Sequence, residues 1–204
     1  MREAFLSTRQ IVVLNIPYGR SAKNKDGARE FYNITSLRLR RYAARVGAGL
    51  TVIHRMEDIP TTRSIIDAWT RTAPGRGNST IYVLKLLAVS QALERHQRVL
   101  LVDDTIFVTP NATDIFSACP SDAAVCAFSE GTSPVPEMST TYNRAKYALK
   151  AKGIDAIATR YFNTGVVVFG QSARGILSPD KIADGMTYFA TGHPSQDYLC
   201  ARVR

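Results

Sequence analysis

The stretch RVLLVDDT, residues 98–105, carries the strongest indication of the fold. Its apolar run, Val99 to Val102, predicts a buried strand, and the run ends abruptly in two carboxylates, Asp103 and Asp104. In open α/β sheets, ligands bind at the carboxyl ends of the strands. Carboxylates at that edge can hold a divalent cation, which can neutralise a diphosphate leaving group. Two aspartates after a strand can also merely begin a turn, so the flanking sequence has to decide.

The sequence before this stretch predicts alternating strands and helices. QIVVLNI (10–16) predicts a buried strand, a helical pattern covers about residues 30–46, and LTVIH (50–54) predicts a second strand. Turn-rich residues 72–80 then precede an apolar stripe at i, i+4, i+7 and i+11, which predicts an amphipathic helix: Tyr82, Leu86, Val89 and Leu93. The β-α-β order predicts an α/β fold with one mainly parallel, Rossmann-like sheet and helices on both faces.

Further elements follow the aspartates. The apolar run Ile106–Val108 is expected to continue the strand, and FNTGVVVF (162–169) predicts a strand of strong β propensity. Residues 123–128 form another short apolar run, residues 129–141 resemble a loop, and residues 142–152 are helix-like.

The composition is that of an ordinary globular domain. The chain has 204 residues, of which 45% are hydrophobic and 9% aromatic, and we expect a single domain covering residues 1–204. No apolar stretch approaches the roughly 20 residues of a membrane span, and the first ten residues lack the apolar core of a signal peptide. Three cysteines without a CxxC pair (Cys119, Cys126, Cys200) predict neither a disulfide framework nor a zinc site. We therefore expect a reducing compartment, and the location is either cytoplasmic or not determined by the sequence.

The chain is strongly basic. Its formal net charge is +9, and four arginines lie on the first predicted helix: Arg38, Arg40, Arg41 and Arg45. A solvated helix face is the commonest explanation for such a cluster, and a nucleotide diphosphate, an acidic glycan or a nucleic acid are the functional alternatives. Nucleic acid is the least favoured of these, because no zinc-finger spacing or RNP-type aromatic run accompanies the charge.

The segment from Tyr82 to Phe116 resembles the glycogenin-like, retaining glycosyltransferases and their wider GT-A relatives. These have a Lys-bearing helix, a strand, an Asp-x-Asp motif and an apolar run closing with Asp-Leu-Phe. Here Lys85 opens the match, Asp103-Asp104-Thr105 stands at the motif, and Asp114-Ile115-Phe116 closes it. The resemblance implies a GT-A type nucleotide-diphospho-sugar transferase fold with Lys85 near the donor. Replacing Lys85 should then weaken donor binding with little effect on the melting temperature.

One position departs from the family pattern. Thr105 stands where the second metal-binding aspartate is expected, and a hydroxyl is a much poorer ligand for a hard cation than a carboxylate. The resemblance then implies that Asp103 and Asp104 together hold Mn²⁺ or Mg²⁺ and that Thr105 contributes a donor contact. Two alternatives stay open: a slipped register that places Val102 first, and weak or absent metal binding.

Two later blocks extend the resemblance. Residues 162–166 are similar to the family's F-N-[ST]-G-[VM] strand, and residues 195–197 (Ser-Gln-Asp) to its D-Q-D element, with Ser195 replacing the first aspartate. The amide of Asn163 in an apolar run is costly unless it meets a ligand or a local backbone partner. The resemblance implies donor contacts from two of these residues, Thr164 and Gly165, and catalytic roles near the transferred sugar for three others: Asn163, Gln196 and Asp197.

The end of the first strand corresponds to the part of the family that surrounds the nucleotide base. The resemblance therefore implies donor contacts from Asn15, Ile16 and Tyr18. A loop tyrosine that packs on its own domain is an equally good explanation of Tyr18.

These patterns favour an enzyme. We expect a hexosyl- or pentosyltransferase that moves a sugar from a UDP or GDP donor to a hydroxyl of a glycan or protein acceptor, with metal assistance and retention of anomeric configuration. The alternative is a GT-A domain that the altered motifs have left inactive, as a nucleotide- or glycan-binding module. A dehydrogenase is disfavoured because no GxGxxG follows a strand. A nucleotide-sugar pyrophosphorylase is disfavoured because no Gly-rich loop follows the first strand.

Overall fold

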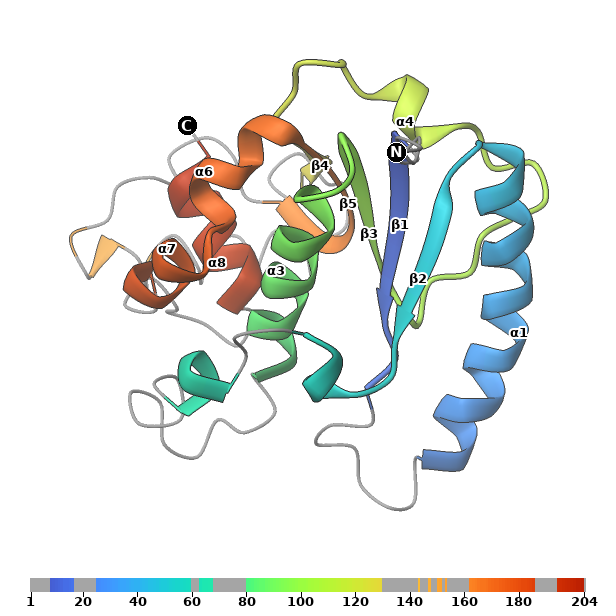
Figure 1. Cartoon of the computed structure of the whole chain (residues 1–204), viewed down its shortest axis with the longest axis horizontal. Coiled ribbons are helices and arrows are strands. Elements are labelled where there is room, and N and C mark those ends of the chain that lie inside the picture. Colours follow the sequence, from blue (N-terminus) through green and yellow to red (C-terminus); the bar gives the residue numbers. More distant parts are fainter. Residues whose placement is uncertain are drawn as a thin grey trace, which may run out of the picture.

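The computed structural model describes residues 8–16, 25–59, 63–67, 80–129, 162–185 and 194–203, with a few single positions between 143 and 153. In this part of the chain, five strands form one sheet in the order β2-β1-β3-β5-β4 (Figure 1). Their bounds are β1 Arg9–Leu14, β2 Gly49–Ile53, β3 Arg98–Asp103, β4 Val125–Ser129 and β5 Phe162–Gly170. β1 is parallel to β2 and β3, whereas β5 is antiparallel to β3 and β4. The predicted mainly parallel sheet is confirmed, with β5 as its reversed strand.

Helices cover both faces of the sheet (Figure 1). On one face α3 packs against the sheet and is itself covered by α6, α7 and α8. On the other face lie α1 and α4. The bounds are α1 Lys25–Arg45, η2 Met56–Asp58, α3 Thr80–Leu93, α4 Ile115–Ala118, η5 Gln171–Ala173, α6 Arg174–Leu177, α7 Pro179–Asp184 and α8 Pro194–Arg202. Among the described helices, none is long and apolar enough to cross a membrane. That the whole chain is one domain stays a prediction.

The central strand β3 is buried on both faces. Its side chains alternate, so that Val99 and Leu101 pack on the α3 side while Leu100 and Val102 pack on the α1 side. A strand covered by helices on both faces needs an uninterrupted apolar run, which is what the sequence shows. The same alternation turns Asp103, the last residue of β3, toward α3.

Helix α3 differs from its prediction. The apolar stripe predicted an amphipathic helix, but α3 is buried almost all round, including Val83, Leu84, Leu87 and Ala88 beside three of the four predicted positions, Leu86, Val89 and Leu93. The physical reason is its position between the sheet and a second layer formed by α6, α7 and α8. A helix enclosed on two sides has no wide polar face.

The chain after β3 also differs from its prediction. Residues 106–108 do not continue the strand, because the backbone turns at Asp104 and Thr105, and the Ile106 N–H donates to the Asp103 carbonyl at 3.0 Å. Ile106 and Val108 instead pack, half-buried, on the α1 side of the core. The regions predicted as turns at 72–80, a loop at 129–141 and a helix at 142–152 lie almost entirely outside the described residues.

Two arginines hold the opposite end of the strands. Arg9 begins β1, Arg98 begins β3, and they are paired in register. Both guanidinium groups lie over the Phe116 ring, at 5.4 Å and 6.0 Å from its centroid. Arg9 also donates to Asp114 at 2.8 Å, and Asp114 caps α4 by accepting from the Phe116 N–H at 2.9 Å. The Asp-Ile-Phe triplet of the sequence resemblance is therefore a structural anchor.

A disulfide joins Cys119, at the end of α4, to Cys126 in β4, and Cys200 is buried as a free thiol. The prediction of unpaired cysteines was therefore wrong, and the expected reducing location loses its basis. Spacing alone could not show the pairing, since it depends on how the chain folds back between α4 and β4.

The disulfide predicts a thiol count. Denatured but unreduced protein should expose one thiol per chain, that of Cys200, and reduction should raise the count to three. The Cys119→Ser/Cys126→Ser protein should lose about 2.5 kcal/mol of unfolding free energy, as a loop of this length implies. Cys200→Ala, the control, should show no thiol before reduction. Three thiols in unreduced wild-type protein would contradict the disulfide.

Asp114 predicts a pH-dependent contribution to stability. Partial burial alone would raise its pKa, but hydrogen bonds from Ser117, Arg9 and the Phe116 N–H, with the Arg9 charge, outweigh burial and hold the pKa below its usual value. A depressed carboxyl pKa stabilises the fold above the unfolded-state pKa and ceases to do so as the pH falls through the folded-state value. Asp114→Ala should therefore cost about 1 kcal/mol at neutral pH and progressively less in acid.

Urea unfolding of wild type and variant at a series of pH values measures this difference. Asp122→Ala, at an exposed aspartate in the turn before β4, is the matched control. A cost for Asp114→Ala that stays constant down to strongly acid pH would show that the charge of Asp114 contributes nothing.

Candidate functional site

The carboxyl ends of β1 and β3 bring two predicted site residues together. The strands are parallel, with Leu14 in register with Asp103, so the residues that follow them meet at one edge. There the Asn15 side-chain amide donates to the Asp104 carboxylate at 3.0 Å. The backbone N–H of Asn15 also donates to the Ile53 carbonyl at 2.9 Å, which extends the β1–β2 pairing by one residue. Asn15 is therefore held in a fixed position beside Asp104.

Lys85 and Asp103 form an ion pair between α3 and β3. The Lys85 side chain is 10% exposed and that of Asp103 is 28% exposed, so the pair lies at the margin of the core. The contact joins the Lys85 ammonium to Asp103 Oδ1. Lys85 is thus a buried cation with a carboxylate partner, whereas a lysine on an ordinary helix face would be solvated. Removing it would leave Asp103 without that partner, so the expectation of an unchanged melting temperature has to be abandoned.

Tyr82 lies one helical turn before Lys85 and belongs to the same cluster. The Lys85 ammonium is 5.3 Å from the centroid of its ring. Burial, followed by the negative charge of Asp103, raises the pKa of the Tyr82 phenol above its ordinary value. The sequence analysis placed Tyr82 only in the apolar stripe of the helix. Its i, i+3 spacing to Lys85 was the signal that could have identified it as a neighbour of the site.

Gly165 allows β5 to approach Asp103 closely. Val166 is in register with Val102, which places Gly165 next to Asp103. A Cβ at position 165 would lie 3.3 Å from Asp103 Oδ2 and 2.8 Å from Asn163 Oδ1, so only glycine fits without movement. The Gly165 N–H donates to Asn163 Oδ1 at 2.6 Å, a local backbone partner that offsets the cost of placing this amide in an apolar strand.

The first turn of α8 holds the Ser-Gln-Asp element in the interior. Ser195, Gln196 and Asp197 are all buried, with exposures of 0%, 4% and 0%. The hydroxyls of Thr164 and Ser195 are hydrogen-bonded at 3.0 Å, which ties α8 to β5 beside Gly165. Ser195 therefore has a defined structural partner at the position where the family pattern has an aspartate.

Three residues that were predicted to contact the donor, Ile16, Thr105 and Tyr18, take no part in the hydrogen bonds and the ion pair described above. Ile16 is buried in the apolar core on the α3 side, so a contact with a nucleotide base would have to come from its backbone. Thr105 is exposed in the turn after β3. Tyr18 lies outside the described residues.

A cation at this site would depend on its ligand for most of its coordination. Among the described residues, no group of three or more His, Cys, Asp or Glu side chains could hold a metal ion. Asp103 is paired with Lys85, and Asp104 with Asn15. Mg²⁺ is commonly bound by one or two protein carboxylates plus substrate phosphates and water. The two aspartates therefore fit a cation that arrives with a diphosphate.

Comparison with known proteins supports the fold assignment. No family model and no curated protein matches the chain. Among solved structures, it is similar to a glycosyltransferase involved in the glycosylation of the major capsid of PBCV-1 (13% identity, 96% of this chain and 76% of that one, TM-score 0.53). It is also similar to mouse xyloside xylosyltransferase 1 (13% identity, 95% and 80%, TM-score 0.55). At this identity the likeness shows the fold alone: the chain has the mixed α/β fold of GT-A type glycosyltransferases.

Proposed function

We propose that the chain is a glycosyltransferase that moves a sugar from a nucleotide diphosphate donor to a hydroxyl of a glycan or protein acceptor. The observation that carries this proposal is the meeting of polar side chains at a single sheet edge: Asn15 after β1, Lys85 of α3, and Asp103 and Asp104 at the end of β3, with Gly165 of β5 close beside Asp103. The apolar side chains of β1 and β3 belong to the two core clusters beneath that edge. Ligands of open α/β sheets bind at such an edge, and both similar structures are glycosyltransferases.

Lys85 supplies the positive charge that sugar transfer needs. As the bond to the sugar breaks, negative charge grows on the departing nucleoside diphosphate, and a fixed cation nearby lowers the barrier. The burial of Lys85 strengthens this effect, because water screens a buried charge poorly. An ammonium has three N–H donors, and the ion pair joins it to a single oxygen of Asp103. Donors therefore remain for phosphate oxygens.

A divalent cation, Mn²⁺ or Mg²⁺, is the second part of the proposal. Asp103 and Asp104 would hold it together with the diphosphate, and when bound it would neutralise part of the diphosphate charge. Thr105, which is exposed beside them, would contribute at most a hydroxyl or a bound water.

Asn163, Gln196 and Asp197 are proposed to lie near the transferred sugar, and transfer is proposed to retain the anomeric configuration. Two observations support these roles. The three residues occur in the order of the family motifs, and the Thr164–Ser195 hydrogen bond holds α8 beside β5, the strand next to Asp103. The donor base is proposed to be uracil or guanine. Because one similar structure is a xylosyltransferase, UDP-xylose belongs in the donor screen beside the hexose donors.

The test is a panel of UDP- and GDP-sugars, with and without Mn²⁺, measured by donor hydrolysis and thermal shift. One donor should be hydrolysed and should raise the melting temperature.

Lys85→Met should lower turnover about 100-fold or more, as expected when one transition-state cation is lost. Lys181→Met, at an exposed lysine of α7, is the matched control and should retain activity. The melting temperatures of Lys85→Met and of the Lys85→Met/Asp103→Asn double variant measure the stability lost when the carboxylate is stranded; turnover is compared only for Lys85→Met, because Asp103 is itself a proposed cation ligand.

The other outcomes are equally informative. Nucleotide binding without hydrolysis of any donor would identify an inactive binding module, and no binding of any nucleotide would refute the proposal. Turnover that survives chelation would show that no divalent cation is needed, and Lys85 would then be the source of positive charge at the diphosphate. If Thr105→Asp tightens Mn²⁺ binding, the register is the one proposed. If only Asp104→Asn abolishes metal dependence and Thr105→Asp changes nothing, the register is shifted by one residue.

The charge of Asp103 can be measured through Tyr82. Because the Asp103 carboxylate contributes to the raised pKa of Tyr82, Asp103→Asn should lower that pKa toward its ordinary value. The measurement is an ultraviolet titration of tyrosinate, with Tyr82→Phe versions of both proteins subtracted to isolate one of the nine tyrosines. Asp180→Asn in α7 is the control and should leave the Tyr82 titration unchanged. An unshifted titration in Asp103→Asn would show that the two groups are not electrostatically coupled.

A further inference from the structure

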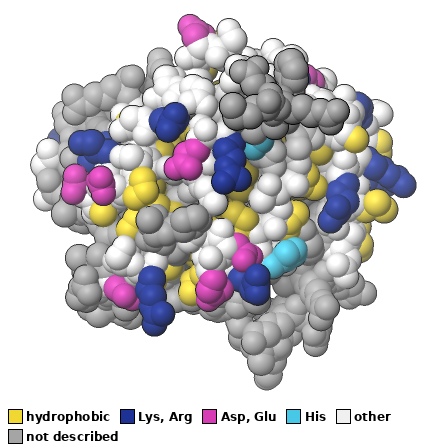
Figure 2. All heavy atoms as spheres, in the orientation of Figure 1, with side chains coloured by type: hydrophobic (Ala, Val, Ile, Leu, Met, Phe, Trp, Pro, Cys, Tyr) yellow, Lys and Arg dark blue, Asp and Glu magenta, His cyan; other side chains and the backbone are white. Residues whose placement is uncertain are grey.

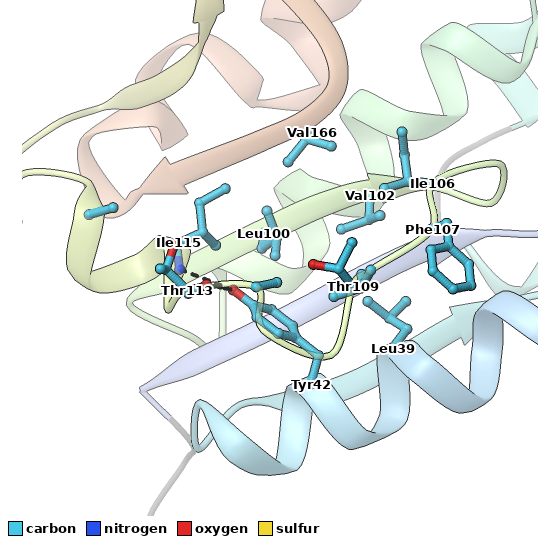
Figure 3. A pocket seen from close by; sticks show the side chains of 13 residues that line it. Leu39, Tyr42, Leu100, Val102, Ile106, Phe107, Thr109, Thr113, Ile115 and Val166 are labelled. Carbon is cyan, nitrogen blue, oxygen red and sulfur yellow. Dashed lines mark hydrogen bonds between the residues drawn. The ribbon is translucent and has the colours of Figure 1, made fainter.

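A cavity lies on the face of the sheet away from Lys85. It has a volume of about 320 Å³, is open on one side, and is lined by α1, by the segment after β3 and by the strands β3 and β5 (Figure 3). Its walls are mainly apolar side chains, including Leu39, Leu100, Val102, Ile106 and Val166. Val102 and Leu100 point to the face of β3 opposite to that of Asp103, so this cavity is separate from the proposed donor site. Its volume is at the lower end of the range of about 300–1,000 Å³ found for ligand sites.

A second hollow with a basic wall adjoins the first. It has a volume of about 260 Å³ and shares Tyr42, Val108 and Thr109 with the apolar cavity. The side chains that distinguish it are three arginines of α1: Arg38, Arg41 and Arg45. Their i, i+3 and i+7 spacing places them along one side of the helix. The apolar cavity therefore adjoins a hollow with a cationic wall.

Contacts with the neighbouring segment hold the walls in place. Arg45 donates to the carbonyls of Pro110 and Ala112, and its guanidinium lies 5.3 Å from the Tyr42 ring centroid. The Tyr42 hydroxyl donates to the Thr113 carbonyl at 3.0 Å. These contacts fix the segment after β3 against α1, so that both hollows have a defined shape.

Two further arginines complete the basic wall. The Arg38 guanidinium lies 5.6 Å from the Phe107 ring centroid. Arg41 is exposed and, within the described residues, has no ion-pair or hydrogen-bond partner. Figure 2 shows Lys and Arg side chains next to hydrophobic ones on the side of the molecule where α1 lies. The cationic hollow therefore has charge to offer a ligand.

We propose that the two hollows together bind a single-chain amphiphile with an anionic head. The alkyl chain would occupy the apolar cavity, and a phosphate or carboxylate head would lie against Arg38, Arg41 and Arg45. Arginine pairs well with phosphate and carboxylate oxygens because its planar donors match their geometry. A concave apolar cavity lined by Leu39, Leu100 and Val102 favours one inserted chain, whereas a membrane surface would need only exposed side chains.

Exposed apolar residues of α1 define the competing explanation. Ile34 and Leu37 are 59% and 52% exposed and lie on the same side of the helix as Arg38 and Arg41. They could rest on an anionic membrane without any chain entering the cavity. The test has to separate this surface from the cavity.

The experiment is a calorimetric titration of the whole chain with alkyl phosphates below their micelle concentrations. Butyl, octyl and decyl phosphate form the series. Inorganic phosphate is the control for the anionic head without a chain, and decanol is the control for the chain without an anionic head. Binding should be one to one, and affinity should rise about fourfold for each added methylene until the cavity is filled. Decyl phosphate should bind more tightly than either inorganic phosphate or decanol.

Three variants test the position of the ligand. Ala112→Phe places a ring in the apolar cavity, and Arg41→Glu reverses one charge of the basic wall. Each should weaken decyl phosphate binding about tenfold or more, a loss of about 1.4 kcal/mol. Arg40→Glu makes the same charge change on the same helix, outside both hollows, and should have less than about twofold effect in physiological salt. If Ala112→Phe fails to fold, Thr109→Trp obstructs the boundary of the two hollows from an exposed position.

Several results would overturn the proposal. Equal losses in Arg40→Glu and Arg41→Glu would show a diffuse charge effect. Unchanged binding in a folded Ala112→Phe or Thr109→Trp protein would place the alkyl chain elsewhere. Binding to anionic phosphatidylglycerol vesicles that needs Ile34 and Leu37 but tolerates Ala112→Phe would identify a membrane-contacting face. Absence of decyl phosphate binding, with a higher melting temperature in Ala112→Phe, would identify a packing gap.

Discussion

The burial of β3 on both faces is the constraint on which the rest of the structure depends. Its four apolar residues, 99–102, are almost completely buried and supply the centre of two separate core clusters. A strand in this position must have helices on either side, which requires the α1 and α3 layers. Because both faces of β3 are covered, the strand can present polar side chains to solvent only at its ends. The two carboxylates, 103 and 104, therefore mark the boundary of the core and the beginning of the site.

The ion pair between Lys85 and Asp103 makes this boundary chemically useful. A carboxylate at the margin of an apolar layer is costly unless a cation accompanies it, and a buried lysine has the same requirement. Each residue thus satisfies the other while both remain at the edge where a ligand would bind. Burial, followed by the negative charge of Asp103, raises the pKa of the neighbouring Tyr82 phenol, so both the surrounding layer and the carboxylate act on this side chain.

The sequence predicted the fold well, because the order of strands and helices depends on local patterns. The apolar run ending in aspartates located the central strand and its polar end, and the β-α-β order gave the sheet and its two helical layers. What failed depended on contacts distant in the chain. α3 is enclosed because α6, α7 and α8 cover it, and Cys119 meets Cys126 because the chain folds back. Local periodicity contains neither fact.

The excess of positive charge shows most clearly why residue counts do not give function. The arginines of this chain have at least two separate roles. Arg9 and Arg98 hold Phe116 and α4 at the amino ends of the parallel strands, far along the strands from the carboxylates. Three arginines of α1, Arg38, Arg41 and Arg45, line a hollow on the surface. Within the part of the chain that the structure describes, the cation paired with Asp103 is a lysine from a third element, Lys85 of α3. The net charge of +9 therefore does not identify a single binding site. Only the position of each basic side chain relative to the sheet distinguishes a structural role from a role in ligand binding.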